Sequence, residues 1–94
     1  MLYVVIAKDG TDEQAPARRA AVRAAHLENA RRLQDSGRLV TGGALLDEQE
    51  NMIGSMMIVD VASEDEAREL VANDVYSAGE VWQEVQIWPY RKAL

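Results

Sequence analysis

A long alanine-rich run, residues 16–36, limits the folds open to this chain more than any other stretch. Its helix propensity is high, and Pro16 suits a first turn because its missing N–H has no helical partner there. Ser36-Gly37 is typical of a helix end. At about 3.6 residues per turn, four residues stack along one side: Val22, His26, Asn29 and Leu33. This side of the predicted helix should be buried against the rest of the chain.

Four apolar segments predict strands: residues 2–7, 38–46, 52–61 and 80–88. Gly42-Gly43 interrupts the second segment, which indicates a bulge or a close approach to the backbone. The short polar stretch before the third strand predicts a hairpin, so these two strands should pair antiparallel.

A capping box, Ser63 with Glu66, predicts the start of a second helix. Ala67, Leu70 and Val71 give that helix a buried side. We expect the helix to fray at residues 73–74 and residues 75–79 to be irregular.

The resulting order is β-α-β-β-α-β. Two right-handed split crossovers of this kind give an antiparallel sheet with both helices on one face, the ferredoxin-like βαββαβ sandwich of the α+β class. One domain should span residues 1–94.

The sheet face without helices is predicted to be apolar. It is expected to carry Tyr3, Val5, Met56, Ile58, Trp82 and Trp88. Monomers rarely expose such a patch, and a short chain has a modest core of its own. We therefore expect a homodimer in which two sheets pack together into an α/β barrel, with higher oligomers left open.

Charge and composition limit the classes of molecule that this chain can bind. Sixteen Asp and Glu against ten Lys and Arg give a net charge of −6, which disfavours nucleic acid. No cysteine is present, so disulfides and thiolate metal sites are excluded, and one histidine leaves no metal constellation. No apolar run approaches the roughly 20 residues of a membrane span, and residues 1–7 do not resemble a signal peptide. These features predict a soluble cytoplasmic protein with no membrane partner.

His26 is the first candidate for a catalytic residue. It lies on the side of the helix that should be buried, and a buried polar ring without a hydrogen-bond partner costs about 1–3 kcal/mol, so another residue should be bonded to it. An imidazole held by a carboxylate through one nitrogen keeps the other free for general acid/base work. Asp74 is the best-placed acid, at the end of the second helix; Asp9, Asp35 and Asp47 are alternatives in turns. Each residue has an alternative interpretation: His26 could be a hydrogen-bonded core histidine without a catalytic role, and Asp74 could be an exposed acid at a helix end.

Three further sets of residues are considered, and two of them have two interpretations each. The Gly42-Gly43 backbone lines a pocket or forms a bulge. The arginines of the first helix, among them Arg18 and Arg19, are expected on a solvated face. An aromatic and methionine set either walls an aromatic-substrate pocket or belongs to the core and dimer interface: Tyr3, Tyr76, Trp82, Trp88, Met52, Met56 and Met57.

Seven segments occur in order: Leu-Tyr-Val-Val at 2–5, Arg-Ala-Ala-His-Leu at 23–27, residues 36–43, 54–59, 63–67, 73–79 and 85–90. Together they resemble the YciI-like (YCII-related domain) family over nearly the whole chain. The resemblance implies a ferredoxin-like fold that dimerises through its sheets, similar to the dimeric α/β-barrel superfamily of muconolactone isomerase-like enzymes. It also implies a helix histidine paired with an aspartate near a pocket, at His26 and Asp74. The family usually has Asp-Pro-Tyr where this chain has Asp74-Val75-Tyr76.

From this resemblance we expect a lyase or isomerase that uses no cofactor and no metal and acts on a small carbonyl or phenolic metabolite. His26 would move a proton, Asp74 would orient it, and Tyr76 with the Gly43 backbone would line the substrate pocket. One alternative is a non-catalytic module of the same fold that binds a small ligand or serves an assembly. A haem-dependent monooxygenase is disfavoured, because nothing beyond His26 could ligate the iron.

Overall fold

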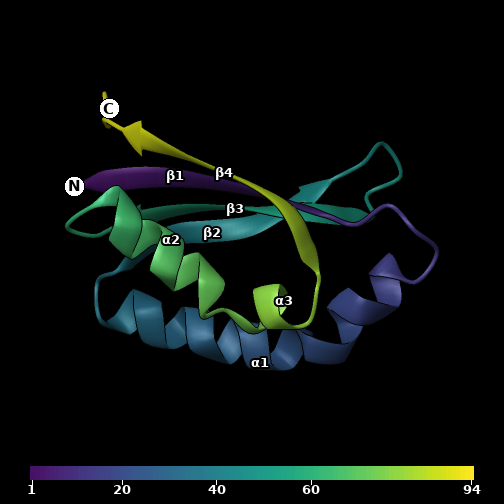
Figure 1. Cartoon of the computed structure of the whole chain (residues 1–94). Coiled ribbons are helices and arrows are strands. Elements are labelled where there is room, and N and C mark those ends of the chain that lie inside the picture. The colour runs from purple at the N-terminus through teal and green to yellow at the C-terminus, as the bar shows by residue number, and fades with distance from the viewer.

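The computed structural model describes residues 1–94 and has three helices on one side of one antiparallel sheet (Figure 1). The strands are β1 (Leu2–Asp9), β2 (Leu39–Leu46), β3 (Met52–Asp60) and β4 (Trp82–Tyr90). The helices are α1 (Ala15–Asp35), α2 (Glu64–Ala72) and α3 (Val75–Ala78). The strand order is β2-β3-β1-β4, and every neighbouring pair is antiparallel. The predicted α+β, ferredoxin-like arrangement is confirmed.

The long helix α1 ends as its sequence predicts. Gly37 adopts a φ of 82°, a conformation that costs glycine little because it has no Cβ. Its N–H donates to the Gln34 carbonyl at 3.0 Å, and the Arg38 N–H donates to the Leu33 carbonyl at 3.0 Å. These bonds satisfy the last carbonyls of the helix and turn the chain toward β2.

The second helix begins at the predicted capping box, with one difference. Ser63 Oγ accepts from the Glu66 N–H at 3.2 Å, whereas the Glu66 carboxylate accepts from the Ala62 N–H, one residue before the cap. The prediction of irregular chain after Asn73 is wrong, because residues 75–78 form the short helix α3. Asp74 starts that helix by accepting from the Tyr76 N–H.

The predicted orientation of β1 is also wrong. Tyr3 and Val5 are buried under the helices, and Val4 and Ile6 lie on the opposite face. Both faces of this strand are apolar, so a pattern with a period of two residues could not distinguish the two orientations.

A shift of register in β4 overturns the prediction that Trp82 and Trp88 share a face. Lys8 pairs with Glu84, but Asp9 pairs with Trp82, so the pairing skips one residue of β4. At this position the side chains of β4 no longer alternate strictly between the two faces of the sheet. Trp82 consequently turns under the helices and is 6% exposed, whereas Trp88 stays on the outer face and is 59% exposed.

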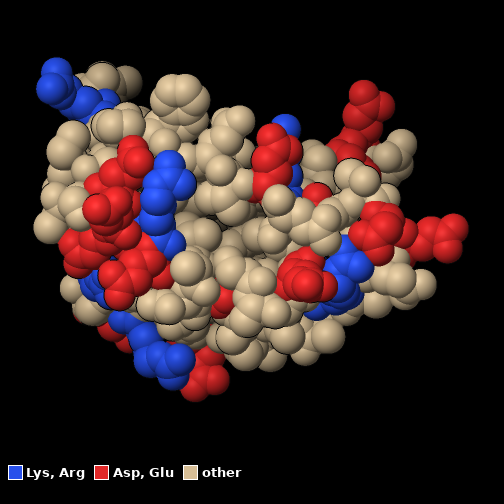
Figure 2. Space-filling model, viewed as in Figure 1, with Lys and Arg blue, Asp and Glu red and all other residues tan.

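The outer face of the sheet remains uncovered by any helix. We call it the open sheet face, and it consists of Leu2, Val4, Ile6, Met56, Ile58 and Trp88. Val4 pairs with both Ile58 and Trp88 in the register, so the apolar side chains form neighbouring rows. In the view of Figure 2, which has the sheet above and α1 below, acidic and basic side chains lie beside one another rather than gathering into one basic surface. No helix combines the length and apolar character needed to cross a membrane.

Gly54 is required where three strands meet. A Cβ at this position would lie 2.6 Å from the Ala7 carbonyl oxygen, closer than backbone can yield without moving a strand. We expect Gly54→Ala to lower the free energy of unfolding by about 1–3 kcal/mol, the usual cost of overpacking. Gly43→Ala is the matched control, since a Cβ there meets nothing within 4 Å. Denaturant unfolding at one protein concentration measures both; equal effects of the two changes would contradict the prediction.

Candidate functional site

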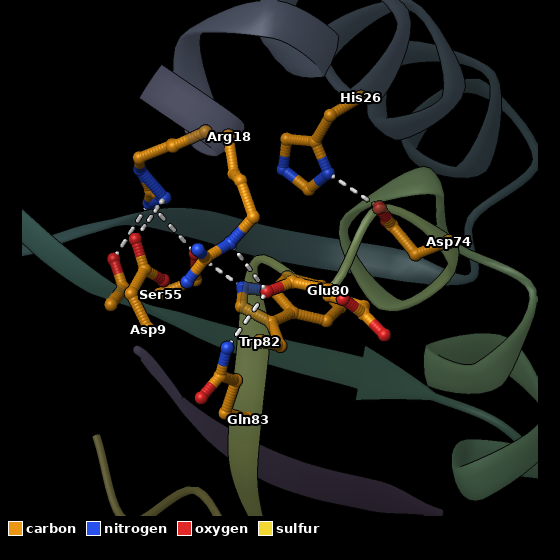
Figure 3. A network of polar contacts seen from close by, with 10 residues as sticks. Asp9, Arg18, His26, Ser55, Asp74, Glu80, Trp82 and Gln83 are labelled. Atoms are coloured by element: carbon orange, nitrogen blue, oxygen red, sulfur yellow. Dashed lines mark hydrogen bonds and ion pairs between the residues drawn. The ribbon is translucent and has the colours of Figure 1, made fainter. Parts of the chain in front are cut away.

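His26 and Asp74 meet in a hydrogen bond between α1 and the start of α3 (Figure 3). His26 Nδ1 lies 2.8 Å from Asp74 Oδ1, and the two side chains are 12% and 2% exposed. The same carboxylate oxygen accepts from the Tyr76 N–H at 2.9 Å. The structure therefore brings together the two residues that the sequence predicts as a pair, and no other aspartate contacts His26.

The carboxylate determines which imidazole nitrogen is available. A carboxylate accepts hydrogen bonds, so Nδ1 carries the proton that His26 donates to Asp74, and the lone pair is on Nε2. Nε2 has no partner within the chain and is not sealed from solvent. The ring also lines a cavity, so Nε2 is the available basic atom of this site.

Two aromatic rings fix the imidazole plane. The Tyr76 ring stacks on His26 with centroids 3.8 Å apart and planes 7° from parallel. Trp82 stands edge-on to both rings, at 5.6 Å from His26 and 5.4 Å from Tyr76. Rotation of the imidazole would lose the stacking and the bond to Asp74 together, so the position of Nε2 is held from two directions.

Arg19 belongs to the site, contrary to the prediction of a solvated arginine face. It is 5% exposed, and its guanidinium carbon lies 4.9 Å from the Tyr76 ring centroid. Since His26 covers one face of the ring, Arg19 covers the other. Arg19 stands seven residues before His26, which is two helical turns, so helical spacing alone could have placed both on one side of α1.

Arg19 also anchors the site to the sheet. Its Nη2 donates to the Gly54 carbonyl at 2.8 Å and to Ser55 Oγ at 3.0 Å, and Trp82 Nε1 donates to the same hydroxyl at 3.1 Å. Ser55 was not predicted, because an isolated serine in an apolar strand carries no distinctive sequence signal. The network joins α1, β3 and β4 beneath the Tyr76 ring.

Asp9 is the only carboxylate near the Arg19 guanidinium. Asp9 Oδ2 lies 3.6 Å from Arg19 Nη1, too far for a hydrogen bond, and Asp9 Oδ1 has no partner. Burial raises the pKa of Asp9 above its ordinary value, and the charges of Arg19 and Arg18 oppose that rise.

The Tyr76 hydroxyl is a hydrogen-bond donor at neutral pH. Burial raises its pKa, and the nearby Arg19 and Arg23 charges only partly offset the rise. The hydroxyl has no partner in the chain, and the Tyr76 side chain lines the same cavity as His26.

The cavity has a volume of about 120 Å³ and lies between α1 and the helix-facing side of β2 and β3. Its lining residues include Arg19, Arg23, His26, Gly42, Gly43, Ser55, Met57 and Tyr76. Gly43 contributes backbone only, whereas a Cβ at Gly42 would approach Met57 Cγ to 3.3 Å. A larger cleft of about 780 Å³ adjoins this cavity and shares Arg19, Arg23 and Met52 with it. No cluster of three or more His, Asp or Glu side chains is placed to hold a metal ion.

Comparison with known proteins identifies the family. The model of the YCII-related domain matches residues 1–91. The chain belongs to the YCII-related domain family. Among curated proteins, Protein YciI of Escherichia coli is 34% identical over 100 aligned residues, with 100% of both chains covered. The resemblance drawn from seven sequence segments is confirmed.

Solved structures of the same fold include two named enzymes. One is 5-chloro-2-hydroxyhydroquinone dehydrochlorinase (TftG) from Burkholderia phenoliruptrix in complex with 2,5-dihydroxybenzoquinone, with a TM-score of 0.83, 24% identity, and 97% and 94% of the two chains covered. The other is SnoaB, a cofactor-independent oxygenase from Streptomyces nogalater, with a TM-score of 0.56, 16% identity, and 99% and 94% covered. At these identities the likeness shows a shared fold.

Asp74→Ala should release the tautomer of His26. Alanine removes the oxygen that accepts from both Nδ1 and the Tyr76 N–H, so nothing holds the ring proton on Nδ1, and α3 loses its cap at a cost of about 0.5–2 kcal/mol. The ¹⁵N chemical shifts of the neutral ring are expected to show protonated Nδ1 in the parent chain and a loss of that preference in the variant. Asp65→Ala, at an exposed position of α2, is the control. An unchanged ring pattern in Asp74→Ala would contradict the assignment.

Proposed function

We propose that this protein is a cofactor-independent lyase or isomerase, which moves a proton on a small carbonyl or phenolic metabolite through His26 and Asp74. The observation that carries the proposal is the state of the imidazole. One nitrogen is tied to a buried carboxylate, and the other is unpartnered at the wall of a cavity. If His26 served only for packing, we would expect both ring nitrogens to be hydrogen-bonded or enclosed, rather than one of them facing a cavity.

The chemistry follows from the two nitrogens. Nε2 takes a proton from an acidic carbon or hydroxyl of the substrate, and the electron pair moves onto the adjacent carbonyl oxygen as an enolate. Asp74 holds the imidazolium that forms and keeps it oriented. In an elimination the enolate then expels a leaving group such as halide; in an isomerisation His26 returns the proton to another carbon. Neither route changes the oxidation state of the system or requires an added oxidant.

The fold neighbours support this choice of substrate. TftG is named as a dehydrochlorinase of a chlorinated hydroxyhydroquinone, and its structure holds a hydroxylated quinone. The hydroquinone offers acidic hydroxyl groups, and the hydroxylated quinone combines an acidic hydroxyl with a conjugated carbonyl; a single base can act on either. The cavity wall beside His26 offers the Tyr76 ring and the Gly43 backbone, which would line the pocket for a flat ring of this type.

Hydrogen–deuterium exchange tests the proton transfer without knowledge of the leaving group. The chain is incubated in D₂O with a panel of hydroxyquinones and cyclic ketones, and NMR follows loss of the acidic C–H signal, with chloride release measured for chlorinated members. We expect His26→Ala to lower the protein-dependent rate by about 10²–10⁴-fold, the usual contribution of a general base. Added imidazole should restore part of the rate by occupying the vacated space.

A second variant separates chemistry from folding. His26→Gln keeps an amide that can donate to Asp74, so it should fold normally and remain inactive. Asn29→Ala, one turn further along α1, is the matched control and should retain the parent rate. Exchange that is unaffected by both His26 variants, or ligand binding with no exchange across the panel, would favour a non-catalytic binding module instead.

We also propose that the open sheet face packs against the same face of a second copy. Trp88 is 59% exposed there, and Val4, Ile6, Met56 and Ile58 are only half-buried by the chain itself. A continuous apolar surface of this kind is costly to leave in water.

Light scattering after size exclusion should give twice the chain mass of 10.4 kDa. Trp88→Lys should reduce the measured mass to that of one chain, because a cation would be buried without a partner in the interface. Ala24→Lys, at an exposed position of α1, should leave the mass unchanged. A parent chain that is monomeric at micromolar concentration, or a Trp88→Lys variant that still dimerises, would rule out this interface.

A further inference from the structure

The cavity beside His26 is positively charged within an acidic protein. The chain carries a net charge of −6, yet no aspartate or glutamate lines this cavity. Arg19, Arg23 and His26 are the lining side chains that can bear charge near neutral pH, and each of them can only be positive or neutral. The cavity therefore favours anions, although the net charge of the whole molecule disfavours them.

Arg19 has hydrogen-bonding capacity that the protein does not use. Its Nη2 is bonded to β3, but Nε and Nη1 have no partner although they are buried. The one carboxylate nearby, Asp9, approaches Nη1 only to 3.6 Å. Buried guanidinium donors without acceptors are costly, and native structures normally satisfy them. An oxygen supplied by a ligand would meet this need after a small adjustment of the pocket.

Arg23 lies one helical turn after Arg19 and forms no ion pair. Its neighbours on α1 differ, since Arg18 is paired with Asp12 and Arg32 with Glu28. Arg23 also lines both the small cavity and the larger cleft. It is an exposed cation at the junction of the two volumes, without a carboxylate to neutralise it.

We propose that Arg19 and Arg23 form an anion subsite at this junction, so that the ligands of the His26 cavity are small organic anions. A carboxylate, phenolate or enolate oxygen binds the two guanidinium groups, and the attached ring or carbon skeleton occupies the cavity beside Nε2. The binding preference stands by itself; its extension to the reacting substrate rests on the proposed function. There, the same arginines would stabilise the negative charge that proton removal places on oxygen.

The dimensions fit one ring. A cavity of about 150 Å³ is known to accommodate benzene, so about 120 Å³ suits a small ring or a branched acid. The rest of a longer ligand would extend into the larger cleft. That cleft also contains Asp12 and Asp47, which would repel an anion placed there, so the charged group belongs at the junction, on the side of Arg19 away from Asp9.

Binding of benzoate and benzamide tests the anion preference, because the two probes match in shape and differ in charge. The Trp82 indole N–H, next to the site, reports binding by NMR titration at fixed ionic strength. We expect benzoate to bind at least about tenfold more tightly than benzamide, as loss of one charge-assisted contact usually costs about that much. Raising the salt concentration should weaken benzoate only.

Variants of α1 locate the subsite. Arg23→Gln should lower the affinity for benzoate about tenfold and leave that for benzamide unchanged. Arg31→Gln is the matched control, since Arg31 is exposed on the same helix, has no ion pair and lines neither volume. Arg19→Lys keeps the charge but loses the planar set of donors, so it should also weaken benzoate, with folding checked by thermal denaturation.

The results separate this inference from the proposed function. Equal binding of the two probes, absence of saturable benzoate binding, or equal effects of Arg23→Gln and Arg31→Gln would overturn the anion subsite whatever His26 does. Benzoate binding that persists in His26→Gln, without proton exchange in the parent chain, would retain the subsite and remove the enzymatic proposal.

Discussion

The contact between His26 and Asp74 is the constraint on which the site depends. Asp74 is almost completely buried, and a carboxylate in such a place is tolerated only when hydrogen bonds replace water. Two donors do so: the His26 ring and the Tyr76 N–H, both on one oxygen. The second of these bonds starts α3, so the group that orients the histidine also shapes the local backbone. The family resemblance implies a proline after this aspartate, where the chain has Val75; the bond from the Tyr76 N–H holds the carboxylate in place whichever residue stands between them.

A stack of three side chains connects this contact to the sheet: the His26 imidazole, the Tyr76 phenol ring and the Arg19 guanidinium. His26 contacts one face of Tyr76 and Arg19 the other, and Arg19 is bonded to β3 through Ser55. Both helix residues lie on the same side of α1, two turns apart. A displacement of that helix would therefore disturb the base and the cation together, which keeps the distance between them nearly constant.

Much of the fold and part of the site were predictable from local patterns. The order of the four strands and two longer helices, the Ser63 cap and the glycine helix end are short-range signals, and the structure confirms them. The pairing of His26 with Asp74 rested on the single histidine of the helix and on the family resemblance. The errors concern Tyr3, Trp82, Arg19 and the short helix α3, where irregular chain was expected. The orientation of a strand with two apolar faces and the register of β4 depend on long-range packing. The position of Arg19 is different, because its spacing of seven residues from His26 already places both side chains on one side of the helix.

The size of the cavity is determined by β2 rather than by the dyad. On its helix-facing side this strand has Gly42 and Ala44, paired with Met57 and Ser55. Larger side chains there would fill the space under α1 while the hydrogen bond between His26 and Asp74 remained intact. Acid/base chemistry and ligand shape thus reside on different elements, α1 with α3 for the first and β2 for the second. A fold organised in this way can keep one proton-transfer group while substitutions on an edge strand change which molecules reach it.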